Sequence, residues 1–98
     1  MDSEIKEYIH RHITKFLSRE NLLKKINLLQ KLQKIGFVNS VEDALYGSLI
    51  ESLLDITIVI NVFEGYSLTS EDILELLDII EHRSSEIKSK VLSVLTGA

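Results

Sequence analysis

The sequence predicts a single all-α domain, residues 1–98, built as a bundle of about four helices. Apolar residues recur every three or four positions along most of the chain, as on one face of an α-helix. Proline is absent, and the breaks in the periodicity carry residues that begin and end helices. We expect helices at about 4–17, 19–35, 41–64 and 70–95, with the third and fourth forming a long antiparallel hairpin.

The first two helices follow from their apolar stripes and their ends. The stripe of the first helix comprises Ile5, Tyr8, Ile9, Ile13 and Phe16. Ser3 opens this helix, and Ser18 is a competent N-cap, so we end the first helix at 17 and begin the second at 19. The second helix centres on Leu22 and Ile26, and Gly36 follows it in the position that favours a glycine.

The third helix begins after Ser40, ends before Gly65 and contains the segment DITIVINVF, residues 55–63, whose alternation resembles a β-strand. An isolated strand would leave its backbone groups unpaired. In a helix, β-branched residues cost only about a few tenths of a kcal/mol each. One helical face also continues from Leu45 to Phe63 without a change of period. We therefore predict a helix, with pairing to the same segment of a second subunit as the alternative.

The fourth helix has the clearest start. Thr69 and Asp72 have the spacing of a capping box, and Leu68 and Ile73 that of a hydrophobic staple. The seam that follows has heptad spacing and comprises Ile73, Leu77, Ile80, Ser84, Ile87, Val91 and Val94. This spacing predicts one continuous helix, and Ser84, the polar position in the seam, is where a bend is expected.

Composition narrows the class of protein. The chain is 45% apolar and 27% charged, as expected of a folded globular domain. It contains no cysteine, which excludes disulfides and zinc–thiolate sites. The first residues are charged and lack the apolar core of a secretory signal, so we expect a cytoplasmic protein. The longest uncharged run, 56–63, is far shorter than the roughly 20 residues that cross a bilayer, so we expect no membrane span.

The motifs of familiar enzymes are absent. The sequence has no glycine-rich phosphate loop, nucleophile elbow, zincin pattern or Cys-His arrangement. We therefore expect a protein that is not an enzyme, with no catalytic residue, no metal site and no cofactor. Glu7 and His10 form one Glu-x-x-His motif, whereas helical metal proteins of the carboxylate-bridged class use two. His82 follows Asp78 by four residues, on the same helical face. Metal binding is therefore only our third hypothesis. His12 lies within the first apolar stripe, and we expect its imidazole to be partly buried and hydrogen-bonded rather than to bind a ligand.

Charge is distributed unevenly. Residues 1–36 carry eight Lys/Arg and four Asp/Glu, a net +4, whereas residues 37–98 carry three and eleven, a net −8. The second helix carries a basic stripe of Lys24, Lys31 and Lys34, and these residues could steer it toward the fourth helix, within one subunit or across a dimer. The acidic stripe of the fourth helix comprises Glu71, Glu75, Asp78, His82 and Glu86. The alternative is a small nucleic-acid-binding or regulatory protein. Its candidate residues are Arg11, Lys15, Arg19, Lys24, Lys31 and Lys34.

Apolar surface is in surplus. As a helix, residues 55–63 would carry apolar side chains almost all round the axis, and such a helix must be covered all round. We therefore expect a non-enzymatic protein-interaction module or small accessory subunit of a larger assembly. Its expected partner is a second copy of the chain, in a homodimer, and/or another protein. The predicted interaction surface comprises Ile58, Val59, Val62, Phe63, Leu76, Ile80, Ile87 and Val91.

Overall fold

The computed structural model describes residues 1–63, 65 and 67–97, and it is all-helical. Its helices are α1 (Ser3–Phe16), α2 (Arg19–Lys34), α3 (Val41–Phe63), α4 (Ser70–His82) and α5 (Ser84–Leu95). The described part of the chain contains no strand, and residues 55–63 lie within α3, so the prediction that they are helical is confirmed. Residue 64, the predicted last residue of the third helix, lies outside the described residues.

The fourth predicted helix is two helices in the structure. The single helix expected over 70–95 is interrupted at Arg83, which has φ −101° and ψ 7° and separates α4 from α5. The Arg83 side chain turns toward α1, where its Nη1 donates to the carbonyl oxygen of His10 at 2.7 Å and its Nη2 to Thr14 Oγ1 at 3.0 Å. Heptad spacing could not predict this break, because the spacing continues unchanged on both sides of it.

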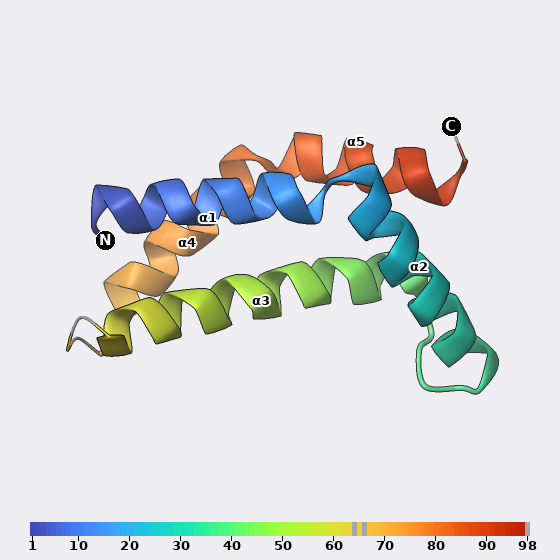
Figure 1. The fold of residues 1–98 in the computed structure, drawn as a ribbon, viewed down its shortest axis with the longest axis horizontal. Helices are drawn as coiled ribbons and strands as arrows, with labels where there is room; N and C mark the ends of the chain where they lie inside the picture. Colours follow the sequence, from blue (N-terminus) through green and yellow to red (C-terminus); the bar gives the residue numbers. More distant parts are fainter. Residues whose placement is uncertain (64, 66, 98) are drawn as a thin grey trace.

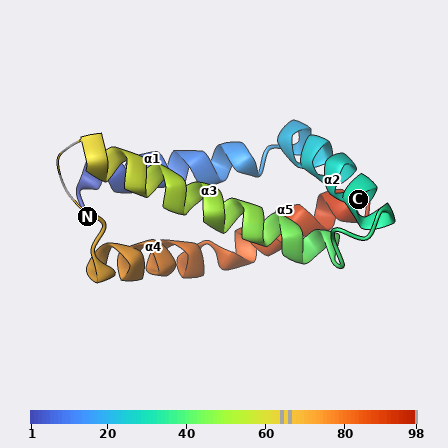
Figure 2. The ribbon, with the colours of Figure 1, turned by 90° about the horizontal axis from the view of Figure 1, so that it is seen from below.

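The helices lie in an elongated arrangement of about 42 × 26 × 20 Å. Helix α3 packs against α1, α2 and α5, and α2 also packs against α5 (Figure 1). Seen from below, α4 diverges from α3 toward the end at which α3 finishes (Figure 2). The predicted four-helix bundle with a long hairpin is therefore not confirmed, since α5 rather than α4 supplies the close packing against α3.

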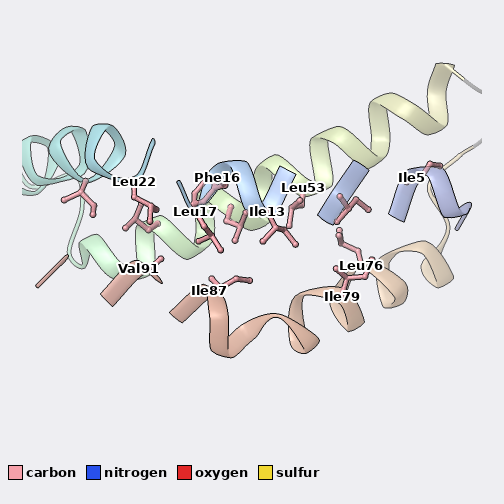
Figure 3. Packing of buried hydrophobic residues seen from close by; sticks show 14 residues of the cluster. Ile5, Ile13, Phe16, Leu17, Leu22, Leu53, Leu76, Ile79, Ile87 and Val91 are labelled. Carbon is pink, nitrogen blue, oxygen red and sulfur yellow. The ribbon is translucent and has the colours of Figure 1, made fainter. Parts of the chain in front are cut away.

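The core is one cluster to which all five helices contribute. Ile9 and Ile13 of α1 and Leu53 of α3 are completely buried. Figure 3 shows Leu76 and Ile79 of α4 directed toward α1 and α3, and Ile87 and Val91 of α5 directed toward the same core. The buried row of α3 follows i, i+4 spacing and comprises Leu45, Leu49, Leu53, Thr57 and Asn61.

The helix ends form largely as the sequence predicts. The capping box of α4 is present, since the Asp72 N–H donates to Thr69 Oγ1 and the Thr69 N–H to Asp72 Oδ2, both at 3.1 Å. The second of these bonds is the main reason that the pKa of Asp72 lies below its ordinary value. Ser18 caps α2 as predicted. The N-cap of α1 is Asp2, which accepts from the Glu4 N–H, rather than the adjacent Ser3.

Candidate interaction surfaces

The side of α3 that lies toward α4 and α5 carries an apolar pocket of about 250 Å³. Tyr46, Leu49 and Ile50 of α3 line it from one side. The opposite lining comes from α4 and α5 and comprises Ile80, Ser84, Ile87 and Lys88. Beyond this pocket α3 and α4 diverge (Figure 2). Several of the apolar side chains that follow on each helix are exposed, among them Ile58 and Val62 of α3 and Ile73 and Leu77 of α4.

Two apolar rows continue from the pocket along the diverging helices. The row of α3 has i, i+4 spacing and comprises Tyr46, Ile50, Leu54, Ile58 and Val62. The row of α4 comprises Ile80, Leu77 and Ile73. On α3, Ile50, Ile58 and Val62 are 38%, 43% and 67% exposed, and on α4 Ile73 and Leu77 are 39% and 50% exposed. The other members of the rows, Tyr46, Leu54 and Ile80, are partly buried against the core. We call the pocket and these two rows the α3–α4 groove.

The outer edge of the α3–α4 groove is acidic. Glu51 and Asp55 are exposed on α3, and Glu81 is exposed on α4. Glu51 precedes Ile58 by two helical turns, and Glu81 follows Leu77 by four residues, so these carboxylates lie beside the two apolar rows. Within the described residues none of the three carboxylates forms an ion pair. Lys88 at the closed end of the groove is the cation among the residues that line the pocket.

A second pocket, of about 500 Å³, lies where α3 ends and α4 begins. Asn61 of α3, Ile5 of α1 and Asp72 of α4 are among the residues that line it. Asn61 is only 7% exposed, and its Nδ2 has no hydrogen-bond partner in the described part of the chain. A buried amide without a partner costs stability, so this position is a weak point of the isolated subunit.

The predicted interaction residues divide between surface and core. Ile58, Val62 and Ile80 belong to the α3–α4 groove. Val59 and Phe63 lie on the outer side of α3, with exposed fractions of 50% and 87%. Val59 also lines a shallow pocket of about 210 Å³ beside Tyr8, which is half exposed.

The other three predicted residues are buried within the subunit. The exposed fractions of Leu76, Ile87 and Val91 are 2%, 4% and 1%. Leu76 and Val91 belong to the core of the same chain, whereas Ile87 forms part of the floor of the pocket in the α3–α4 groove. The spacing of apolar residues identified the seam, but it could not show which of these residues other helices of the same chain would cover.

The basic residues of α1 and α2 are all exposed, as a nucleic-acid surface would require. They are Arg11, Lys15, Arg19, Lys24, Lys31 and Lys34. Two of them face carboxylates of their own helix, since Arg11 lies 3.5 Å from Glu7 and Lys24 lies 3.4 Å from Glu20. Arg11 and Lys15 also line a pocket of about 230 Å³ with Tyr8 and His12.

The outward side of α2 is apolar as well as basic. Leu28, Leu32 and Ile35 follow one another at spacings of four and three, and Leu28 and Ile35 are 58% and 65% exposed. Gly36, with φ 86°, then turns the chain, and the Phe37 N–H donates to the carbonyl oxygen of Leu32 at 2.9 Å. This bond keeps Phe37, which is 80% exposed, next to the end of the helix. We call Leu28, Leu32, Ile35 and Phe37 the α2 outer stripe.

His12 and Ser52 form a contact that resembles a catalytic pair but has the geometry of a structural one. His12 Nε2 lies 3.0 Å from Ser52 Oγ, and Ser52 Oγ donates its proton to the carbonyl oxygen of Leu49 at 2.8 Å. With the Ser52 proton directed at the Leu49 carbonyl oxygen, the imidazole nitrogen donates to the serine in this arrangement. Burial, and then the charges of Lys15 and Lys25, lower the pKa of His12.

The remaining histidines are not gathered into a metal site. His82 Nδ1 lies 2.8 Å from the carbonyl oxygen of Asp78, and this bond, followed by the carboxylate of Asp78, raises the pKa of His82. The His10 carbonyl oxygen is occupied by Arg83. Within the described residues, no three His, Asp or Glu side chains are placed together so that they could hold a metal ion.

Sequence reasoning missed part of the groove. Tyr46, Ile50 and Leu54 were not among the predicted interaction residues, although their i, i+4 row was readable beside the core row that begins at Leu45. Two adjacent apolar rows on one helix indicate that two sides of the helix need to be covered. The row that begins at Leu45 is covered by the core of the same chain. Helix α4 diverges from α3 along the second row (Figure 2). The link from Arg83 to α1 had no signal in the sequence, because it joins residues more than 65 positions apart.

Helix α3 is long and apolar enough to cross a membrane, by length and composition alone. The argument from the longest uncharged run did not detect this, because scattered charges interrupt the run without making the helix polar. Core helices of soluble proteins pass the same test. The prediction that the chain has no membrane span therefore stays a prediction.

Comparison with models of protein families gave no match, and neither did comparison with curated proteins or with solved structures.

Proposed function

We propose that this chain is a non-enzymatic protein-interaction module that self-associates, with a second copy of the chain filling the α3–α4 groove. The observation that carries the proposal is the set of five exposed apolar side chains along these two rows. Ile50, Ile58 and Val62 of α3 are 38–67% exposed, and Ile73 and Leu77 of α4 are 39% and 50% exposed. Monomeric soluble proteins seldom leave a continuous apolar surface of this kind open to water.

The shape of this surface suits a helix. Recognition of a helix in a groove uses apolar anchors at i, i+3 or i+4, and i+7, which lie along one face of the bound helix. Ile73, Leu77 and Ile80 have this spacing on one wall, and the i, i+4 row of α3 forms the other. A chain that also exposes apolar helix faces elsewhere can supply such a helix from a second copy.

An enzymatic role has less support. The contact of His12 with Ser52 supports no enzymatic role, because the Ser52 hydroxyl donates to the Leu49 carbonyl oxygen. Binding of nucleic acid by the basic residues of α1 and α2 is the competing function. It has less support because Arg11 and Lys24 face carboxylates of their own helices. Phosphate binding would weaken steeply as salt is raised, so titration with DNA and RNA at two salt concentrations distinguishes it.

The variant Leu77→Lys tests the proposed function, with Leu92→Lys as its matched control. Both leucines are about half exposed, at 50% and 45%, but Leu92 lies on α5 and is not among the residues of the α3–α4 groove. We expect Leu77→Lys to reduce self-association at least tenfold while Leu92→Lys does not, as measured by sedimentation velocity. If the two variants self-associated with equal affinity, the α3–α4 groove would not be the contact surface.

A further inference from the structure

We infer that the segment of the second copy that fills the α3–α4 groove is the α2 outer stripe, and that the exchange is reciprocal. This inference rests on the proposed function, because it names the occupant of the same groove. It also connects two surfaces that face water in the single subunit and that no helix of the same chain brings together.

The spacing of the two surfaces agrees. On α2 the anchors Leu28, Leu32 and Ile35 have spacings of four and three, and on α4 Ile73, Leu77 and Ile80 have the same spacings. At 1.5 Å per residue both rows extend over roughly 10 Å, so side chains of one can pack between those of the other. Phe37 follows Ile35 and adds a large aromatic side chain that is 80% exposed in the subunit.

The charges of the two surfaces are opposite. Lys24 and Lys31 stand four residues before and three after Leu28, so both are its neighbours on the surface of α2. Lys24 also lies 3.4 Å from Glu20 of the same helix, in an exposed pair that contributes only about 0–1 kcal/mol. The edge of the α3–α4 groove carries Glu51 and Glu81 beside its apolar rows. Neither of these carboxylates forms an ion pair within the described part of its own chain. A helix with an apolar face and basic flanks therefore suits this groove better than an acidic segment such as α3 or α4.

The α2 outer stripe cannot reach the groove of its own chain. Helix α2 is held against the core through Leu22 and Ile26. Figure 1 shows α2 at the opposite end of the molecule from the point where α3 ends and α4 begins. Two copies placed antiparallel would bring each α2 beside the groove of the other. A two-fold axis makes these two contacts equivalent and closes the assembly as a dimer.

A charge exchange tests this inference. The first variant carries Lys24→Glu and Lys31→Glu, and the second carries Glu51→Lys and Glu81→Lys. Each variant alone would place like charges in both contacts of the dimer, and we expect its self-association to fall at least tenfold. In an equimolar mixture every α2 faces a groove of opposite charge, so we expect a mixed dimer with an affinity close to that of the wild-type dimer.

The control for net charge is the variant Lys15→Glu with Lys90→Glu, which makes the same charge change as the first variant but at exposed residues of α1 and α5 rather than of α2. Circular dichroism confirms that each variant is folded before sedimentation is measured. We expect the control to associate like the wild type, and the differences between variants to shrink at high salt.

The possible outcomes separate the two proposals. If the wild-type chain stays monomeric, the proposed function fails. If the wild-type chain associates but both charge variants associate equally well, or if mixing them restores nothing, self-association stands and the α2 outer stripe is not the occupant. The inference is supported only if each charge variant by itself associates weakly and the equimolar mixture forms a dimer.

Discussion

Replacing Arg83 with methionine tests what sets the angle between α4 and α3. The Arg83 side chain is 15% exposed and joins the α4–α5 junction to α1. It donates to the His10 carbonyl oxygen at 2.7 Å and to Thr14 Oγ1 at 3.0 Å, and it pairs with Glu86 at 2.9 Å. Arg83→Met keeps most of the apolar stem of the side chain but removes each of these bonds.

The expected loss follows from the kinds of bond removed. A hydrogen bond from a charged donor contributes about 1.5–3 kcal/mol, and less where water reaches it. The pair with Glu86 lies at the surface and contributes about 0–1 kcal/mol. We therefore expect Arg83→Met to lower the free energy of unfolding by about 1–3 kcal/mol, which corresponds to a decrease in Tm of about 5–15 °C for a domain of this size.

Urea denaturation followed by circular dichroism measures this change, and Glu86→Gln is the control. The control removes the charge of Glu86 but leaves both bonds from Arg83 to α1, so its expected loss is about 0–1 kcal/mol. If Arg83→Met cost no more than Glu86→Gln, the bonds to His10 and Thr14 would contribute nothing, and the reasoning would be wrong. Because the junction orients α4, we also expect Arg83→Met to weaken self-association.

Three further changes test the core, the groove end and a cap. Leu53 is completely buried, so Leu53→Ala is expected to cost about 2–5 kcal/mol in chemical denaturation, and a loss below about 1 kcal/mol would contradict its place in the core. Asn61→Leu removes a buried amide that lacks a partner, so we expect a gain of about 1–3 kcal/mol in the melting of the monomer, whereas a loss would indicate that the amide has a partner. The folded pKa of Asp72 is below its unfolded value, so its charge stabilises the fold above the unfolded pKa, and this contribution is lost as the pH falls through the folded pKa. The stability difference between wild type and Asp72→Asn should therefore begin to shrink near about pH 4 and vanish once the pH is below the folded pKa, and a difference that persisted there would mean the charge is not its source.

Much of the fold could be read from the chain, because local signals decided it. The capping box of Thr69 and Asp72 marked the start of α4, and the unchanged period through 55–63 identified a helix where the residue types resembled a strand. The break at Arg83 lies next to Ser84, where the polar position in the seam indicated a bend, but spacing could not predict a complete break or its contacts with His10 and Thr14 on α1. Heptad spacing describes a helix surface and carries no information about tertiary bonds of this kind.

The candidate site could be predicted only in part, for a related reason. Ile58 and Val62 are exposed, as expected for an interaction surface, whereas Leu76, Ile87 and Val91 are buried. Both groups have the same residue types at similar spacing. The direction of α4 relative to α3 decides which of these residues become buried. That direction depends on contacts between residues far apart in the sequence, such as those of Arg83 with α1.

Sedimentation of the wild-type chain over a range of concentrations tests the central claim most directly, because the claim is that a second copy covers the α3–α4 groove. The subunit has a mass of 11.2 kDa. The account predicts that the measured mass rises with concentration and approaches that of a dimer, with no larger species, because two reciprocal contacts close the assembly. A mass that stays at 11.2 kDa over the whole range would contradict it.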